Sequence, residues 1–492
     1  GPYHADLGDF SSAGGARIKT FDRTPQSTVS LGVGENGFGR LLAMGTADLG
    51  QATLYGAIEG QVYEGPWTDI EEDVEKLNGL IKVSGGGAER SWSGTLMFYD
   101  NEWNSADQIP ERAVSGDIID ELGSIDDSLG GDSQRISLSG RYSIEKALSQ
   151  SEFSAYIIDY KMNLWSNFTY LLDDPVDGDQ FQQVDERRIF GGRYSLAWSD
   201  SVDSPFQHVL GAELRYDDID TVGLYPTRQR ELLGTVREDT VDQASVGAYY
   251  EMTWRFAPRW RAVAGLRGDY YWFDVDADNP ANAGDDTDTI VSPKGSLIYA
   301  FSDTTEGYLS AGYGFHSNDA RGVAIRVDPV TGEAVDPVDA LVESRGAEIG
   351  FKTLALESLN SSLALWYLEL DSELLFVGDA GTTEANRPSE RWGIEFNNFW
   401  ALNDIWSLEA DLAWTDASFS DSALEGDDIP GALETVVTGT VSAQYPSGWF
   451  GSFRVRYFSG APLVEDGSVE SDGSTIANLA LGWSNDSWRV QA

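Results

Sequence analysis

Two acidic stretches carry the residues best suited to binding a metal ion. Residues 173–179 read Asp-Asp-Pro-Val-Asp-Gly-Asp, and residues 274–288 place six aspartates in fifteen positions. Calcium prefers carboxylate oxygens, which makes Asp174, Asp177 and Asp179 candidate calcium ligands. Both stretches lack the twelve-residue calcium-loop pattern, notably its closing glutamate. We therefore expect solvated loops, with calcium binding in the loops as the alternative.

The residue inventory offers nothing for catalysis. The chain contains no cysteine, which excludes thiol nucleophiles, thiolate metal sites and disulfides. Its three histidines, His4, His208 and His316, lie far apart and form neither a spaced metal motif nor a pair with a candidate serine. No glycine-rich phosphate loop follows a predicted strand. We predict a protein that is not an enzyme and holds no cofactor.

Arginine side chains provide the other candidate chemistry, because guanidinium groups bind anions. Four of them recur on the polar sides of predicted strands and are candidate ligand-binding residues: Arg261, Arg267, Arg454 and Arg456. Pairing with carboxylates such as Asp269, Glu251 and Asp411 is the expected alternative. Three further candidates share a long predicted loop, where contact with a solute is plausible: Asn318, Asp319 and Arg321.

Composition excludes several classes of protein. Lys and Arg number 33 against 81 Asp and Glu, a net charge of −48, which would repel a nucleic-acid backbone. Hydrophobic residues at 41% and aromatic residues at 12% are too abundant for a disordered acidic chain. No window approaches the roughly 18 consecutive apolar residues that a membrane helix needs, so any membrane span must consist of strands.

The elements that must position the candidate residues alternate between apolar and polar faces. In residues 244–256, Val246, Tyr250 and Trp254 lie on one face, and polar residues lie on the other. Residues 260–272 repeat the pattern. The apolar faces carry no charge, and aromatic residues cluster at strand ends. Because a charge on the lipid face of a barrel costs about 2–4 kcal/mol at the midplane, this pattern favours strands with lipid outside and a polar lumen inside.

Short and long connections alternate along the chain, as in bacterial outer-membrane barrels with tight periplasmic turns and long extracellular loops. We place about twenty strands between residues 26 and 484, with a further strand beginning near Trp488. An even total then predicts about 22 strands. The predicted fold is all-β: a large antiparallel transmembrane β-barrel of about 20–22 strands.

Several segments resemble TonB-dependent outer-membrane receptors, and their order strengthens the resemblance. Residues 3–18 (YHADLGDFSSAGGARI) resemble the last stretch of the plug domain, and residues 29–34 (VSLGVG) resemble the first barrel strand. The segments similar to the seventh loop and the strands after it are 317–322 (SNDARG), 345–351 (RGAEIGF), 363–370 and 376–381 (FVGDAG). The resemblance implies that residues 1–24 are the tail end of the plug domain and its linker, and that residues 25–492 are the barrel.

The same resemblance implies that most of the plug, the TonB-contacting segment and the terminal strand lie outside this sequence. It predicts an active transporter in the outer membrane of a Gram-negative bacterium, driven by TonB. The expected cargo is a scarce, bulky solute of the iron-siderophore type, with cobalamin or an oligosaccharide as rivals. A passive diffusion porin and a surface-binding protein are the alternative functions. The expected partners are outer-membrane lipid and lipopolysaccharide, the TonB complex and a small-molecule cargo, with a monomeric barrel.

Overall fold

The chain is described here by a computed structural model that covers residues 1–356, 358–377, 382–385 and 387–492. The stretch 376–381, which contributed to the family resemblance, therefore lies partly outside the described residues. The described residues form mostly long strands and two helices of five residues each.

The elements follow one another in chain order. The strands of the first half are β1 (Thr28–Val33), β2 (Gly39–Asp48), β3 (Ala52–Tyr63), β4 (Val74–Gly86), β5 (Arg90–Asn104), β6 (Gly130–Lys146), β7 (Ser149–Ser166), β8 (Phe181–Trp198), β9 (Phe206–Arg228), β10 (Glu231–Leu232) and β11 (Arg237–Ala257). Those of the second half are β12 (Trp260–Ala277), β13 (Gly284–Ser302), β14 (Thr305–Ser317), β15 (Leu341–Leu356), β16 (Leu359–Leu370), β17 (Leu374–Val377), β18 (Thr382–Ala385), β19 (Ser389–Ala401), β20 (Trp406–Phe419), β21 (Thr435–Gln444), β22 (Trp449–Phe458), β23 (Ser474–Ser484) and β24 (Arg489–Gln491). The helices are α1 (Glu111–Ser115) and α2 (Ala320–Ala324).

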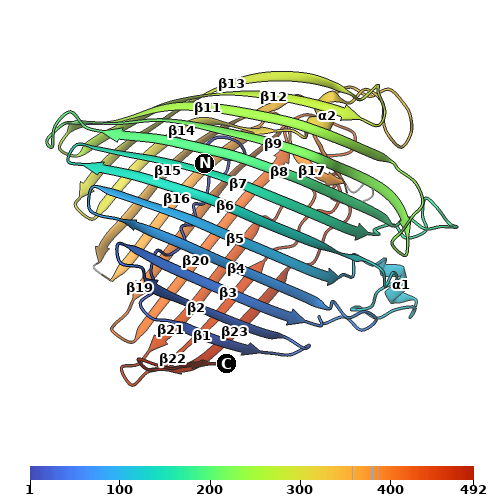
Figure 1. The fold of residues 1–492 in the computed structure, drawn as a ribbon, viewed down its shortest axis with the longest axis horizontal. Coiled ribbons are helices and arrows are strands. Elements are labelled where there is room, and N and C mark those ends of the chain that lie inside the picture. Colours follow the sequence, from blue (N-terminus) through green and yellow to red (C-terminus); the bar gives the residue numbers. More distant parts are fainter. Residues whose placement is uncertain (357, 378–381, 386) are drawn as a thin grey trace.

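Each long strand pairs with its neighbours in the sequence, and the 22-stranded antiparallel sheet curves into a barrel (Figure 1). The short β10 folds back on the end of β9, while β17 and β18 form a separate hairpin. The predicted fold class is confirmed. The sequence did not predict β10, β17, β18 or the helices, because these lie in long connections where no lipid imposes the alternation that identified the other strands.

Connections are short at one end of the barrel and long at the other. Residues 258–259 and 303–304 are tight turns, whereas residues 105–129 and 318–340 connect strands at the opposite end. We call these the short-turn end and the loop end. Among the described residues, no helix is long and apolar enough to cross a membrane.

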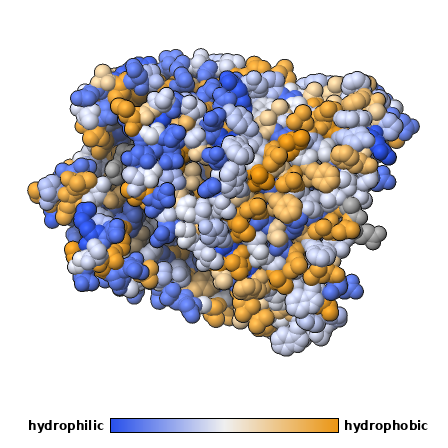
Figure 2. All heavy atoms as spheres, turned by 180° about the vertical axis from the view of Figure 1, so that it is seen from behind, coloured by the Kyte–Doolittle hydropathy of each residue, from blue (hydrophilic) through white to orange (hydrophobic). Residues whose placement is uncertain are grey.

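The apolar faces of the strands point away from the lumen. Val246 is 55% exposed and Leu266 is 53% exposed, whereas Arg267, the next residue along β12, is 4% exposed. Figure 2 shows apolar residues gathered in rows over the strands, while the loop end at the left is largely hydrophilic. The predicted alternation, with apolar side chains outside and polar ones inside, is confirmed.

A row of charged residues marks where the apolar outer face stops toward the loop end. Strand register places six residues directly opposite one another on β7, β8, β9, β11, β12 and β13: Asp159, Arg188, Asp218, Asp242, Asp274 and Asp285. Two residues nearer the short-turn end, the same face carries Phe190, Tyr216 and Trp272. An aromatic row beneath a charged row is typical of a membrane–water interface.

Residues 1–24, all of which the structure describes, lie inside the barrel and form neither strand nor helix (Figure 1). We call them the N-terminal segment. Ala5 is 0% exposed within the lumen. The segment leaves the lumen beside β2, where the backbone N–H of Thr24 donates to the Thr46 hydroxyl at 2.9 Å.

Candidate functional site: the lumen and its mouth

A network of ion pairs joins four strands on the lumen wall. Arg267 on β12 pairs with Asp269 on the same strand at 2.8 Å and with Glu213 on β9 at 3.1 Å. Arg193 on β8 lies 3.2 Å from the second oxygen of Glu213 and donates to the Tyr249 hydroxyl of β11 at 3.1 Å. Such multiple pairing is what makes charged groups tolerable away from bulk water. Asp269 is one of the carboxylates that the sequence suggested as partners for the wall arginines.

The N-terminal segment is bound into this network. Asp6 lies 3.2 Å from Arg193, and the backbone N–H of Ala5 donates to the Glu251 carboxylate at 3.2 Å. A Cβ atom added to Gly8 would lie 2.5 Å from a guanidinium nitrogen of Arg267, so a side chain at this position would have to displace that guanidinium. Charged wall residues therefore hold the segment in place.

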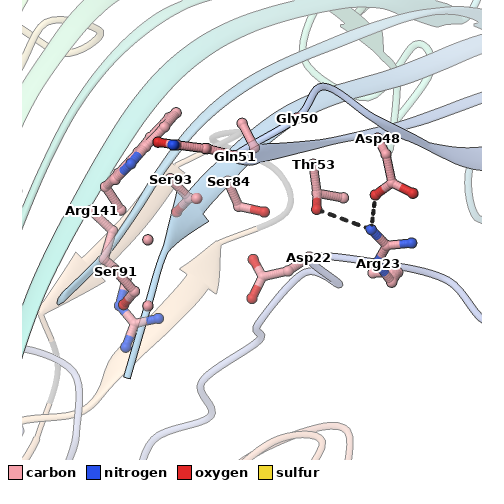
Figure 3. Close-up of a pocket in the computed structure, with 15 residues that line it drawn as sticks. Asp22, Arg23, Asp48, Gly50, Gln51, Thr53, Ser84, Ser91, Ser93 and Arg141 are labelled. Atoms are coloured by element: carbon pink, nitrogen blue, oxygen red, sulfur yellow. Dashed lines mark hydrogen bonds and ion pairs between the residues drawn. The ribbon is translucent and has the colours of Figure 1, made fainter. Parts of the chain in front are cut away.

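A second set of contacts holds the segment near the short-turn end. The Lys82 ammonium, on a side chain that is 5% exposed, lies 2.6 Å from Asp22. Arg23 forms an ion pair with Asp48. Asp22, Arg23 and Asp48 border an open cavity of about 460 Å³, with Arg141 on its other side (Figure 3). The segment thus passes the short-turn end through a polar, water-accessible space.

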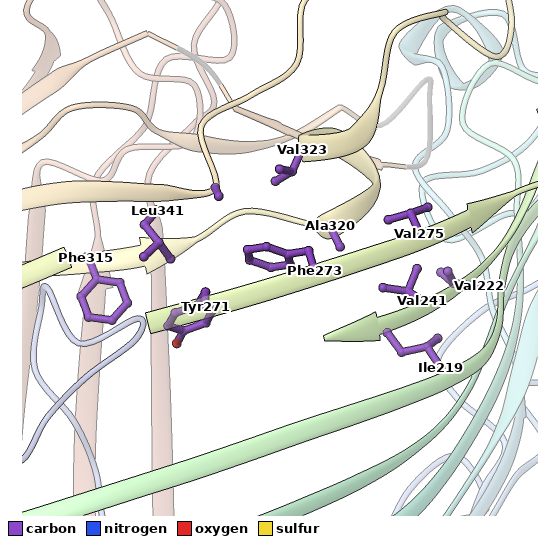
Figure 4. Packing of buried hydrophobic residues seen from close by; sticks show 11 residues of the cluster. Ile219, Val222, Val241, Tyr271, Phe273, Val275, Phe315, Ala320, Val323 and Leu341 are labelled. Atoms are coloured by element: carbon purple, nitrogen blue, oxygen red, sulfur yellow. The ribbon is translucent and has the colours of Figure 1, made fainter. Parts of the chain in front are cut away.

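The loop between β14 and β15 folds into the mouth of the barrel (Figure 4). Its helix α2 supplies Ala320 and Val323, which pack against Phe273 and Val275 on β12 and Val241 on β11. Each of these side chains is at most 3% exposed. Full burial of a large apolar side chain contributes about 1.5–3 kcal/mol, so this cluster fixes the loop over the lumen wall.

The loop residues predicted to contact a solute shape the start of this loop. The Asn318 amide donates to the Asp339 carbonyl at 2.7 Å and so ties the two ends of the loop together. Asp319 accepts the backbone N–H of Arg321 at 2.8 Å, and the Arg321 guanidinium binds the same carboxylate at 2.8 and 3.0 Å. Burial alone raises the pKa of the Asp319 carboxyl, but the charge and hydrogen bonds of Arg321 outweigh burial and hold that pKa well below its ordinary value. Contact of Asn318, Asp319 and Arg321 with a solute stays a prediction.

The four predicted wall arginines do not form one site. Arg267 lies within the ion-pair network, and Arg261 lies nearer the short-turn end, where it pairs with Glu306 of β14 at 3.0 Å. Arg454 and Arg456 lie on β22, far around the barrel from β12 (Figure 1). Within the described part of the chain, the Nε of Arg456 is buried without a hydrogen-bond partner. Their role in ligand binding stays a prediction.

The candidate calcium ligands form a hydrogen-bonded turn between β7 and β8. The Asp179 carboxylate accepts the backbone N–H groups of Leu172 and Asp174 at 2.7 Å each. The Asp174 carboxylate accepts those of Asp177 and Val176 at 3.0 and 2.9 Å, and these bonds lower the pKa of Asp174. Among the residues that the structure describes, no group of three or more His, Cys, Asp or Glu is arranged to hold a metal ion. Calcium binding stays an untested prediction.

Sequence reasoning missed two features of the lumen. Lys294 of β13, 6% exposed, donates to the carbonyls of Pro2 at 3.2 Å and Tyr313 at 2.9 Å. The apolar cluster beneath α2 was also missed, although the sequence contained a signal. The inward positions of β12 change from the charged Arg267 and Asp269 to tyrosine, phenylalanine and valine toward the loop end, so the alternation of polar and apolar residues stops there.

The sequence and fold match those of known proteins. Residues 81–492 match the family described as TonB dependent receptor-like, beta-barrel, which covers most of the chain. The chain belongs to the TonB-dependent receptor family. The receptor is therefore a Gram-negative outer-membrane protein, with its short turns on the periplasmic side and its loops outside the cell. Its family comprises transport receptors.

Solved structures share the receptor's fold at low sequence identity. The ferric yersiniabactin uptake receptor FyuA from Yersinia pestis has a TM-score of 0.74 and 14% identity, over 94% of this chain and 73% of that chain. The siderophore receptor PiuA from Acinetobacter baumannii has a TM-score of 0.76 and 12% identity, over 98% and 80%. The copper transporter OprC has a TM-score of 0.73 and 17% identity, over 94% and 72%.

Proposed function

We propose that this receptor imports a scarce, bulky solute across the outer membrane, with an iron chelate as cargo and TonB as the source of energy. The observation that carries the proposal is the way the lumen holds the N-terminal segment. Asp6 pairs with Arg193, and Gly8 packs on Arg267. Polar contacts of this kind can break and re-form in water, so a pulling force can withdraw the segment without unfolding the barrel wall.

In this proposal residues 1–24 are the tail end of the plug domain and its linker, and residues 25–492 are the barrel. Two contacts support a boundary at this point. Asp22 pairs with Lys82, and Thr24 binds Thr46, immediately before β1 begins at Thr28. Residues on the lumen side of these contacts have no regular structure, as expected of a segment that changes position.

Two arguments favour an iron chelate as cargo. Arg456 on the lumen wall, whose Nε is buried without a hydrogen-bond partner among the described residues, provides a planar donor of the kind that suits the anionic oxygen ligands of a ferric chelate. FyuA and PiuA, named as a ferric yersiniabactin uptake receptor and a siderophore receptor, share the fold. Cobalamin and an oligosaccharide are the rival cargoes. The proposed partners are this cargo, the TonB complex, and lipid and lipopolysaccharide against the outer face of a monomeric barrel.

Uptake by cells tests the proposal. Iron-limited cells that carry the full-length receptor should accumulate radiolabelled ferric chelates, and accumulation should stop when TonB is deleted while the receptor level in the outer membrane is unchanged. If excess unlabelled cobalamin or oligosaccharide reduces accumulation of the radiolabelled chelate, that competitor becomes the assigned cargo. Uptake that persists at the same rate without TonB would refute energised import and favour passive diffusion.

A further inference from the structure

The barrel wall is split between β13 and β14 on the side toward the extracellular end. The two strands pair as far as Lys294 and Gly312, and no farther. Within the described residues, β13 then continues to Gly284 paired with β12 alone, and β14 continues to Ser317 paired with β15 alone. The split begins at Pro293, which lies next in register and has no N–H group to donate to β14.

A lysine replaces the hydrogen bond that proline cannot make. If the pairing of β13 with β14 continued beyond Lys294 and Gly312, Pro293 would lie opposite Tyr313. The carbonyl of Tyr313 instead accepts a hydrogen bond from the Lys294 ammonium at 2.9 Å. The same ammonium donates to the carbonyl of Pro2 at 3.2 Å, which links the edge of the split to the N-terminal segment.

The N-terminal segment takes the place of β13 along the rest of upper β14, which we define as residues 313–317. The N–H of Phe10 donates to the Phe315 carbonyl at 3.1 Å. The Asp9 carboxylate accepts the N–H and the hydroxyl of Ser317 at 2.7 and 2.6 Å. In a continuous sheet, the backbone groups of every second residue on this edge of β14 would face β13. These groups are bound instead by the N-terminal segment and by Lys294.

The matching edge of β13 is satisfied by its own aspartates and touches β15 at one point, where the Asp288 carboxylate accepts the N–H of Leu341 at 3.2 Å. The N–H groups of Thr287 and Thr289 donate to the carboxylates of their preceding residues, Asp286 and Asp288, at 2.7 Å each. Val291 on the same edge is 55% exposed on the outer face. Unsatisfied backbone groups in hydrocarbon cost several kcal/mol, so this edge gains stability if a strand pairs with it.

Upper β14 is compatible with two positions. It now bends inward, where Phe315 is 1% exposed and lies edge-on to the Tyr271 ring at 6.0 Å. In the continued register Phe315 would lie opposite Val291 and face the membrane, which also suits a phenylalanine. The inward bend carries α2, which follows directly after Ser317, over the mouth (Figure 4).

We propose that upper β14 is a switch strand whose position is set by the N-terminal segment. While the segment is in the lumen, upper β14 stays inward and α2 covers the lumen wall at the mouth. When the segment is withdrawn, upper β14 pairs with residues 289–293 of β13, which closes the wall and moves α2 off the mouth. The mechanism deepens the proposed transport and rests on it only for the force that withdraws the segment.

Disulfide formation in the purified receptor tests the switch, because the chain has no cysteine of its own. Ile290→Cys with His316→Cys places thiols at positions that become directly opposite only when upper β14 pairs with β13. Ser296→Cys with Ser310→Cys lies in the paired part of the same two strands and is the matched control. Asp9→Ala removes the two bonds to Ser317 and should accelerate diamide-driven cross-linking of 290 with 316 by at least about tenfold, with the 296–310 rate unchanged.

A labelling experiment provides a second readout. Ala320→Cys lies in α2 at a position 3% exposed, and Val330→Cys lies farther along the loop at a position 77% exposed. Asp9→Ala should raise the maleimide reaction rate at 320 severalfold and leave that at 330 unchanged. The proposal is overturned if Asp9→Ala leaves the 290–316 rate unchanged, or if this pair cross-links as fast as the control pair in the parent. Neither result depends on uptake, so the switch and the transport function fail separately.

Discussion

Replacing Arg267 with methionine should destabilise the barrel by about 3–5 kcal/mol at pH 7, because Asp269 loses its partner and Glu213 loses one of its two. Arg267 and Asp269 are 4% and 3% exposed, so solvent screens neither charge. Glu213 keeps Arg193 at 3.2 Å, which places the loss mainly on Asp269. Methionine retains an unbranched apolar stem, so the substitution removes charge and hydrogen bonds more than packing.

Thermal unfolding in detergent micelles measures this loss. An unfolding entropy of about 2.1 cal/mol/K per residue gives roughly 1 kcal/mol per degree for 492 residues, so Tm should fall by about 3–5 °C. Adding Asp269→Asn to Arg267→Met should recover much of the lost Tm, since it removes the carboxylate charge that has no partner. Arg23→Met is the matched control, because its ion pair is 53% and 72% exposed and contributes at most about 1 kcal/mol. A Tm for Arg267→Met within about 1 °C of the parent would refute the reasoning.

Three further predictions concern the mouth, the lumen wall and the outer face. Asp319→Asn should increase proteolysis of the 318–340 loop at pH 7, and equal cleavage of variant and parent would contradict this. Since Arg321 lowers the pKa of the Asp319 carboxyl, the native loop should stay protected above the ordinary carboxylate range and lose protection only as pH falls below that range. Gly247→Ala should cost about 1–3 kcal/mol in urea unfolding because its Cβ would overlap the buried guanidinium of Arg267. Gly268→Ala, whose Cβ would point outward from β12 into open space, should be nearly neutral. Leu266→Arg should cost about 2–4 kcal/mol in a lipid bilayer, but Asp274→Arg, which interrupts a like-charged row above the lipid, should not destabilise; equal costs would invalidate the assigned membrane boundary.

Much of the barrel could be predicted from sequence because the membrane imposes one simple rule. A residue that touches hydrocarbon must be apolar, and the next residue along a strand faces the opposite way. Strand β12 shows this clearly, since Leu266 is 53% exposed on the outer face and Arg267 is 4% exposed inside. Turn residues at the short connections then set where each strand ends.

The candidate site could be predicted only in part. Arg267 was assigned to the lumen from the alternation along its strand, and the wall arginines as a group were expected to pair with carboxylates that included Asp269; the structure pairs Arg267 with Asp269 at 2.8 Å. Its neighbour Glu213 lies 54 residues earlier in the chain, and Asp6 reaches the same network from the N-terminal segment. No local pattern in the sequence specifies such partners, because they meet only when the sheet curves around the lumen.

The sequence by itself determined the fold class and the inward and outward faces of the strands, since these depend on residue type at fixed local spacing, while the family followed from the resemblance of several segments in their order along the chain. Tertiary structure alone decided that Asn318 and Asp319 shape an inward-folded loop, and that Lys294 and Asp9 satisfy a strand edge that β13 leaves free. The physical reason is that hydrogen bonds and ion pairs across a lumen depend on distance in space, and residues hundreds of positions apart come within that distance only when the sheet curves into a barrel.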